Sequence, residues 1–305
     1  MPRAVRLDDY GDIDVLYIAD VDVPDVAAGQ VRVAVRAAGL NLGEAKVRRG
    51  LLKHMFPSTF PSGQGSDFAG VVDAVGEGVD ASLVGTDVLG WTDERSSQAE
   101  YVVVPADQIV SKPANVSWEV AGSLFVVGST AYAALAAVSV AAGDVLVVTG
   151  AAGGVGSLVS QLAVSRGVRV IGIASERDHD WLRSLGVEPV TYGDGVRERI
   201  TAVTDKVDAL VDTAGSGYVA LGIEMGIDPE RIDTIVDFPA VAEFGVKAQG
   251  SSAGSSAHVL EELVTLVSQG TLQVQIDRTY PLDDVRSAYH HLEEEPGRGK
   301  VVLVV

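Results

Sequence analysis

The fold of this chain is decided by Val145-Leu-Val-Val-Thr149 and by the segment that follows it, Gly150-Ala-Ala-Gly-Gly-Val-Gly156. The first segment is a run of apolar residues, which is typical of a strand covered on both faces of a parallel sheet. A helical pattern from Ser157 to Ser165 follows the glycines. Glycines in such a turn let the backbone approach an anion, which the helix start attracts through its unpaired N–H groups. The pattern predicts a dinucleotide pyrophosphate site.

Strands and helices alternate beyond this point. Further strands are expected at Val168–Ala174, Ala209–Val211 and Ile232–Val236, with helical segments between them. Such alternation predicts an α/β fold with a doubly wound parallel sheet.

The segments near the two ends of the chain have a different pattern, in which most of the expected elements are strands. Val31–Val35 alternates apolar and polar residues, which predicts a half-buried strand. The other elements expected there are strands at Phe68–Val75, Tyr101–Pro105 and Val301–Val305, and helices at His258–Ser268 and Leu282–Leu292.

Composition excludes several classes of function. The 305 residues carry 23 Lys and Arg against 42 Asp and Glu, a net charge of −19. This balance argues against nucleic acid and against anionic membranes as the main ligand. The absence of cysteine removes disulfides, thiol nucleophiles and cysteine-ligated zinc.

One uncharged stretch, Val120–Gly143, is long enough to cross a membrane. Its content is Ala-rich and interrupted by Gly122, Ser123, Gly128 and other small residues. A buried helix of a soluble protein is the favoured interpretation, and we expect a cytoplasmic protein without a signal peptide.

The end of the second strand indicates which cofactor binds. NAD sites commonly place a carboxylate there, whereas NADP sites need a cation for the 2′-phosphate. Ala174 occupies the carboxylate position, and Ser175 and Arg177 are suited to a phosphate. NADPH is therefore expected, although Glu176 would favour NADH if it turned toward the ribose. The glycine spacing, Gly-x-x-Gly-x-x-Gly, also departs from the usual Gly-x-Gly-x-x-Gly, so a plain strand–helix turn is the alternative to any cofactor.

Six further motifs accompany the glycine loop along the chain: Asn41-Leu-Gly-Glu-Ala-Lys46-Val-Arg48-Arg-Gly50, Gly65-Ser-Asp-Phe-Ala-Gly70-Val-Val, Ala99-Glu-Tyr-Val-Val-Val-Pro105, Ser129-Thr-Ala-Tyr132, Asp212-Thr-Ala-Gly215 and Gly299-Lys-Val-Val-Leu303. Together, over nearly the whole chain, these motifs resemble those of zinc-free medium-chain dehydrogenases/reductases, in the quinone oxidoreductase (zeta-crystallin-like) branch.

The resemblance implies a GroES-like β-rich substrate domain, residues 1–119 and 255–305, around an inserted Rossmann domain, residues 120–254, with the cofactor in the cleft between them. It implies that Asn41 and Thr130 lie by the nicotinamide ribose and amide, with Phe238 as the nicotinamide wall. The remaining residues that it assigns to the cofactor are Ala152, Gly153, Gly154 and Val155 at the pyrophosphate, Ser175, Arg177 and Tyr192 at the 2′-phosphate, Gly215, and Lys300 near the cleft.

Departures from the family pattern bear on the chemistry. Zinc-dependent relatives have His-Glu where this chain has Ser66-Asp67, and they use a cysteine that this chain lacks. The five histidines show no ligand spacing, so no metal site is expected. Leu42 replaces a common proline and Lys46 a common tyrosine beside the presumed substrate pocket.

Hydride transfer from NADPH to a quinone or an activated enone is the expected reaction, because the developing charge is delocalised and needs no metal. Lys46 is the candidate donor to the developing enolate, with a solvated surface lysine as the alternative, and Asn41 would orient the ring. Glu44 and Arg48 are expected to form an ion pair at the start of a helix. Trp91 either lines the pocket or packs.

Other functions stay open. The chain could reduce an enoyl thioester or a carbonyl group in biosynthesis, or it could bind NADPH as a sensor or structural protein with little turnover. The resemblance also implies a homodimer joined at the edges of the Rossmann sheets, and the apolar stretch Phe238–Gly250 would suit such an edge.

Overall fold

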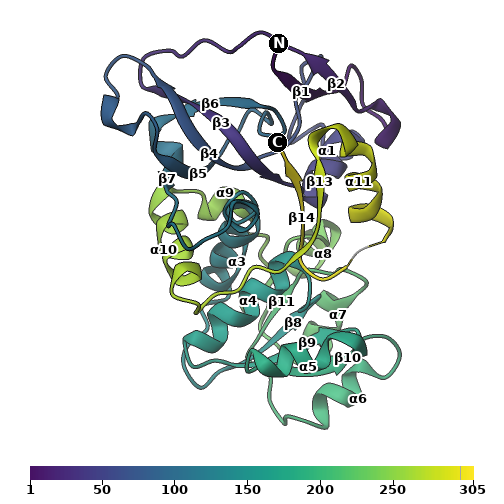
Figure 1. Ribbon diagram of the computed structural model, residues 1–305. Coiled ribbons are helices and arrows are strands. Elements are labelled where there is room, and N and C mark those ends of the chain that lie inside the picture. The colour runs from purple at the N-terminus through teal and green to yellow at the C-terminus, as the bar shows by residue number, and fades with distance from the viewer. Residues whose placement is uncertain (296) are drawn as a thin grey trace. The chain divides into compact units, whose positions relative to one another are not determined.

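Residues 1–295 and 297–305 are described by the computed structural model, in which the chain divides into two units (Figure 1). Unit 1 comprises Met1–Val126, Ser256–Ser268 and Val274–Val305. Unit 2 comprises Val127–Ser255 and Gln269–Gln273. The first unit is therefore assembled from both ends of the chain.

Unit 2 is built on a parallel five-stranded sheet with the order β10-β9-β8-β11-β12. Its strands are β8 (Val145–Thr149), β9 (Arg169–Ala174), β10 (Glu188–Thr191), β11 (Ala209–Asp212) and β12 (Ile232–Thr234). Successive strands leave β8 first on one side and then on the other, so the order reverses between β8 and β11. Ligands of doubly wound folds bind at such a switch point, beyond the carboxyl ends of the strands.

Apolar runs place these strands in the core of unit 2. All five residues of β8 are buried, and Val147, Ile171, Leu210 and Ile232 belong to one hydrophobic cluster. The connecting helices are α4 (Gly154–Ser165), α5 (His179–Ser184), α6 (Val196–Thr201) and α7 (Tyr218–Glu224). The predicted doubly wound parallel sheet is confirmed.

The sheet of unit 1 is mostly antiparallel, with the order β13-β14-β3-β4-β5-β7 and with β6 paired to β3. Its strands are β3 (Gln30–Gly39), β4 (Asp67–Val75), β5 (Asp87–Trp91), β6 (Tyr101–Pro105), β7 (Ile109–Ser111), β13 (Ile276–Pro281) and β14 (Lys300–Val304). A separate hairpin joins β1 (Arg3–Arg6) to β2 (Tyr17–Asp20). The helices of this unit include α1 (Leu42–Arg48), α10 (Ala257–Ser268) and α11 (Val285–Glu294). The N-terminal strand β3 thus lies beside the C-terminal strand β14.

The uncharged stretch 120–143 does not form one continuous helix, contrary to the sequence prediction. It contains the end of α2 (Trp118–Ala121) and then α3 (Phe125–Val138). The helix breaks at Gly122, where an added Cβ would lie 2.5 Å from the carbonyl oxygen of Ala37. Ser123 turns its hydroxyl back onto the carbonyls of Glu119 and Val120. Among the described residues, no helix is both long and apolar enough to span a bilayer.

The stretch Phe238–Gly250, expected at a sheet edge, is helical over its first part. Residues Phe238–Phe244 form α8, which begins with a proline in its first turn and is capped by the Asp237 carboxylate accepting from the Ala240 N–H. Lys247 makes an isolated parallel bridge to Asp233 on β12. The sheet edge therefore consists of the short strand β12 and this single bridge.

Asp233 on this edge is a buried carboxylate with few partners. Its Oδ1 accepts a 2.7 Å hydrogen bond from the Gln249 N–H, while Oδ2 accepts none from any described residue. Burial raises the pKa of Asp233 to about 6, against an ordinary value of 3.8. The folded state consequently holds this proton more tightly than the unfolded chain, and stability falls as the pH rises through this interval.

Replacement of Asp233 by Asn is expected to stabilise the protein by about 1–2 kcal/mol at pH 8, because the neutral amide avoids the cost of a buried charge. The gain should shrink as the pH falls below 6 and disappear at about pH 3, where most of the wild-type carboxyl is protonated in both states. Urea unfolding at both pH values measures the difference, with the exposed Asp205→Asn as the control. A gain of equal size at both pH values would contradict the assignment.

Candidate active site

The buried carboxylate of Asp212 links the ends of three strands at the carboxyl edge of the unit 2 sheet. Asp212 closes β11 and accepts hydrogen bonds from the hydroxyls of Thr149 at 2.6 Å and Thr234 at 2.9 Å, which close β8 and β12. It also accepts from the N–H groups of Ala214 and Gly215. These bonds fix the first residues of the loops that leave the switch point.

The glycine loop beside this carboxylate has no room for a side chain at Gly150 or Gly156. Gly150 has φ +59°, in the left-handed region that favours glycine. A Cβ on Gly156 would lie 2.2 Å from the carbonyl oxygen of Gly150, so the helix start packs directly on the turn. Gly153 is the N-cap residue of α4, and its carbonyl accepts from the N–H of Ser157.

The first turn of α4 therefore presents backbone donors to the carboxyl edge. The N–H groups of Gly154, Val155 and Gly156 precede the first bond of the helix, as at every helix start. The first turn contains no acidic residue. Ala152 and Gly153, also predicted to hold the pyrophosphate, are at least partly exposed in the same turn. This arrangement fits a phosphate group, which needs donors and no nearby carboxylate.

The residues predicted to hold the 2′-phosphate lie at the ends of two paired strands. Ala174 of β9 pairs with Thr191 of β10, so Ser175 and Tyr192 each follow directly after a paired residue. Arg177 has a side chain that is 64% exposed, and its Nε lies 3.4 Å from Asp178. Glu176 is exposed as well.

Arg199 holds the loop after β10 and was not predicted from the sequence. Its guanidinium donates to the carbonyls of four consecutive residues, Thr191, Tyr192, Gly193 and Asp194, at 2.8 to 3.1 Å. A cation so engaged stabilises the loop that carries Tyr192 and has little capacity left for a ligand.

Three more predicted residues lie elsewhere in unit 2. Gly215 follows β11 with φ +73° and donates to Asp212. Phe238 begins α8, beyond the carboxyl end of β12, and is 43% exposed. Thr130 lies on α3 and is buried. Gly215 and Phe238 thus follow strands that also end at this edge.

In unit 1, Asn41 is held on three sides by charged groups. Lys300 donates to its Oδ1 at 2.5 Å, while its Nδ2 donates to Glu44 at 3.0 Å and to Asp67 at 2.9 Å. An ammonium can only donate and a carboxylate can only accept, so these partners fix which amide atom is oxygen. Both amide hydrogens are engaged, and the side chain has only one oxygen lone pair left to offer.

Asp67 and Lys300 complete this buried cluster. Asp67 accepts from the N–H of Val126 at 2.7 Å, and Lys300 also donates to the carbonyl of Leu40. The Lys300 Nζ lies 3.8 Å from Asp67 Oδ2. The structure thus brings together Asn41 and Lys300, two residues that the sequence analysis assigned to the cofactor, and adds Asp67.

Burial dominates the ionisation of these groups. It raises the pKa of both carboxyls, Glu44 and Asp67, and lowers that of the Lys300 ammonium. Opposite charges counter each shift, because Lys300 lowers the pKa of Asp67 while Asp67 and Glu44 raise that of Lys300. The neighbouring charges therefore compensate part of the desolvation penalty.

The predicted ion pair between Glu44 and Arg48 is wrong, because each side chain has partners elsewhere. Glu44 accepts from Asn41, Ser66 and Tyr289. Arg48 pairs with Glu293 at 2.9 Å, and its guanidinium lies over the ring of Tyr289. Both side chains therefore bind α11 instead of one another.

Three polar residues of this cluster were missed from the sequence: Gln64, Gln98 and Tyr289. The hydroxyl of Tyr289 accepts from the amides of Gln64 at 3.0 Å and Gln98 at 2.9 Å. All three side chains are buried. The available signal was the position of Tyr289 on the apolar face of its helix, since a buried hydroxyl requires a partner.

Lys46 and Trp91 are neighbours of residues in this cluster, but none of the hydrogen bonds described above involves their side chains. Lys46 is partly exposed on α1, two residues beyond Glu44. Trp91 is buried, pairs with Asp67 across β4 and β5, and stacks on Phe125 with ring centroids 4.3 Å apart. The packing role of Trp91 is thereby explained, and the catalytic role of Lys46 stays a prediction.

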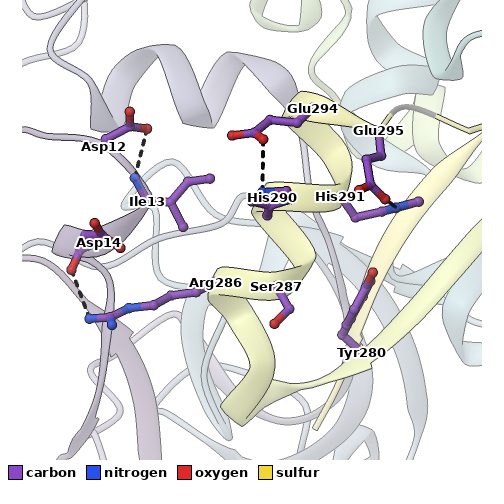
Figure 2. Close-up of a pocket in the computed structure, with 10 residues that line it drawn as sticks. All are labelled: Asp12, Ile13, Asp14, Tyr280, Arg286, Ser287, His290, His291, Glu294 and Glu295. Carbon is purple, nitrogen blue, oxygen red and sulfur yellow. Dashed lines mark hydrogen bonds and ion pairs between the residues drawn. The ribbon is translucent and has the colours of Figure 1, made fainter.

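The hollow shown in Figure 2 is a different surface of unit 1. It has a volume of about 510 Å³ and is lined by residues of α11 such as His290 and Glu294, and by Asp12 and Asp14. No residue predicted for the cofactor or for catalysis lines it. Among the described residues, no group of three or more His, Asp or Glu side chains is placed to hold a metal ion.

Comparisons with known proteins agree with this architecture. The profile of the alcohol dehydrogenase GroES-like domain matches residues 27–114, and that of a zinc-binding dehydrogenase domain matches residues 185–303. The structure of a quinone oxidoreductase from Coxiella burnetii superimposes with a TM-score of 0.89, at 31% identity, over 100% of this chain and 99% of that one.

Two curated relatives match over nearly the entire chain. A 2-methylene-furan-3-one reductase of Solanum lycopersicum is 33% identical over 99% of this chain and 78% of its own length. A chloroplastic NADPH-dependent alkenal/one oxidoreductase of Arabidopsis thaliana is 32% identical over 97% of this chain and 77% of its own length. Since sequence, fold and motif order agree over the full length, the chain belongs to the medium-chain dehydrogenases/reductases, in the zinc-free quinone oxidoreductase branch.

Proposed function

We propose that this oxidoreductase uses NADPH to reduce a quinone or an activated enone. The observation that carries the proposal is the acid-free start of α4 above a glycine turn in which a Cβ would clash, combined with Arg177 and Ser175 after β9. The names of the tomato and Arabidopsis relatives support an enone or alkenal acceptor.

The residues present fit NADPH. The donors of Gly154 and Val155 would hold the pyrophosphate, and the exposed guanidinium of Arg177 would pair with the 2′-phosphate, aided by Ser175 and Tyr192. Phe238 offers an exposed aromatic face for the nicotinamide. Local donors of this kind overcome the unfavourable net charge of −19.

Asn41 would serve as an acceptor. Its two amide hydrogens are taken by Glu44 and Asp67, so it suits a hydroxyl or N–H group of the cofactor and not the carbonyl oxygen of a substrate. Lys300 holds the amide oxygen from the other side. A fixed acceptor would orient the nicotinamide half of the cofactor for transfer.

When bound, NADPH would supply a hydride to the carbon β to the carbonyl of an enone, and the electron pair of the double bond would be taken up by the carbonyl oxygen. The negative charge would be spread over the enolate, and a proton added at the α carbon would complete the reduction. Lys46 is the proposed donor to this charge, because an ammonium group stabilises an oxyanion and can deliver a proton.

Steady oxidation of NADPH is expected when the purified protein is given a panel of quinones, enones and one enoyl thioester. NADH measured in parallel should be used poorly, and a chelator should leave the rate unchanged because the chain has no cysteine ligands. NADPH binding without turnover on any acceptor would favour a sensor or structural protein. Turnover of the thioester alone would favour the biosynthetic reductase.

Replacement of Arg177 by Ala is expected to raise the KM for NADPH about tenfold and to leave that for NADH unchanged, because the 2′-phosphate is the part of the cofactor that the guanidinium would contact. Initial rates with both cofactors measure the change. Arg183→Ala is the matched control, since this arginine is similarly exposed and pairs with Asp180 on α5. An equal rise in KM for both cofactors would show that Arg177 does not bind the 2′-phosphate.

Replacement of Lys46 by Gln is expected to lower kcat about a hundredfold while the dissociation constant for NADPH stays unchanged, since the ammonium would act on the substrate alone. Stopped-flow rates and fluorescence titration separate the two quantities. Lys53→Gln, an exposed lysine on the next turn of the chain, serves as the control. If both variants keep full activity, the proton comes from elsewhere.

A further inference from the structure

Helices α1 and α11 lie side by side (Figure 1). Two pairs of side chains join them. Glu44 and Arg48 are four residues apart on α1, and Tyr289 and Glu293 are four residues apart on α11. Residues at this spacing share one face of a helix. The hydroxyl of Tyr289 donates to Glu44 at 3.1 Å, and the guanidinium of Arg48 donates to Glu293 at 2.9 Å. The two helices are therefore joined by a hydrogen bond at each of two successive turns.

The direction of the bonds at Tyr289 follows from its neighbours. The amide nitrogens of Gln64 and Gln98 both donate to the phenol oxygen. Because both lone pairs of that oxygen are thus occupied, its hydrogen is directed to the carboxylate of Glu44. Tyr289 is fully buried, which leaves water no access to this bond.

Glu44 transmits this constraint to Asn41. One carboxylate oxygen accepts from Asn41 Nδ2 and from the Ser66 N–H, each at 3.0 Å. The other accepts from the Asn41 N–H at 3.2 Å and from Tyr289. A single carboxylate therefore holds both the backbone and the amide of Asn41, and its second oxygen is set by Tyr289.

We propose that Tyr289 is a positioning residue of the active site, which acts through Glu44 to fix the orientation of the Asn41 amide, the acceptor proposed above for NADPH. This inference rests on the proposed function, since it assigns the held amide to cofactor orientation. Tyr289 touches neither substrate nor cofactor in this role. Its effect passes through one carboxylate to one amide.

The charged and titratable groups that face Glu44 come from three elements: Asp67 on β4, Lys300 on β14 and Tyr289 on α11. Arg48 on α1 lies over the ring of Tyr289 instead. Glu44 must be ionised to accept all of its donors. Burial raises the pKa of Glu44, and hydrogen bonds from Asn41 lower it. Loss of the phenol hydrogen removes a further donor to the charged form, so the pKa of Glu44 should rise.

Tyr289→Phe is expected to lower kcat about tenfold or more with a smaller rise in the KM for NADPH, because a misdirected amide impairs orientation more than affinity. The acid limb of the pH profile of kcat should move to higher pH. Tyr17→Phe is the matched control, because Tyr17 donates a 2.8 Å bond to the carboxylate of Asp8 at the surface. That variant should retain the wild-type rate and profile.

A double-variant cycle tests the route. If Tyr289 acts through Glu44, Tyr289→Phe combined with Glu44→Gln should lose no more activity than the worse single variant. Additive losses, or an unshifted pH profile with unchanged kcat in Tyr289→Phe, would overturn the inference. Should Tyr289→Phe be too unstable to purify, Gln98→Leu removes a donor to both Tyr289 and Glu44 and is measured in the same way.

Cofactor binding separates this inference from the proposed function. If none of the tested acceptors supports oxidation of NADPH by the wild-type protein, the proposed function fails. Titration of NADPH fluorescence can still compare cofactor binding by the variants. A weaker dissociation constant for Tyr289→Phe than for Tyr17→Phe, at equal thermal stability, would then support the positioning role. Equal constants would refute it.

Discussion

The interior of unit 1 depends on the burial of the Glu44 carboxylate. An ionised carboxylate removed from water is stable only when hydrogen bonds replace its hydration. Glu44 obtains them from Asn41, Ser66, Gln98 and Tyr289, which lie on separate segments of the chain. The segments around positions 41, 66, 98 and 289 are consequently bound to one point, which explains how the two ends of the chain form a single unit.

The charges that surround Asn41 are unbalanced, and this imbalance has a structural consequence. Glu44 and Asp67 contribute two carboxylates, and Lys300 contributes one ammonium. The amide of Asn41 contacts all three and so separates the like charges while bonding to each. Among these four residues Asn41 is the neutral one, and its orientation is set by its hydrogen bonds to the other three. A residue held by three charges is well suited to present a fixed acceptor.

The elements that the sequence predicted correctly are those whose signal is local. Val145–Thr149 is apolar throughout and is followed by glycines, so the strand and its turn could be placed without reference to the rest of the chain. The amphipathic helix at 258–268 was predicted within one residue of its start. The predicted strand at 232–236 ends early, at Thr234, because the Thr234 hydroxyl accepts from the N–H groups of Val236 and Asp237 and turns the backbone.

The errors lie where distant contacts override local pattern. Glu44 and Arg48 have the spacing of an intrahelical ion pair, yet their partners on α11 are 245 residues away. Of the apolar stretch expected at a sheet edge, Phe238–Phe244 forms a helix, because a capping aspartate and an early proline start it, and only Lys247 bridges to the edge strand. The polar cluster of Gln64, Gln98 and Tyr289 follows no periodicity, because each residue comes from a different segment and they converge only in the folded protein.

The interruption of the uncharged stretch at Gly122 and Ser123 also shapes the active site. By ending one helix and starting another, it creates a helix start, and the N–H of Val126 from this start donates to Asp67. Asp67 stands where zinc-dependent members of the family have the second residue of a His-Glu pair. Here that carboxylate accepts a hydrogen bond from the first turn of a helix. The helix break at Gly122 and Ser123 therefore also helps to fix Asp67, one of the three charged residues that hold Asn41.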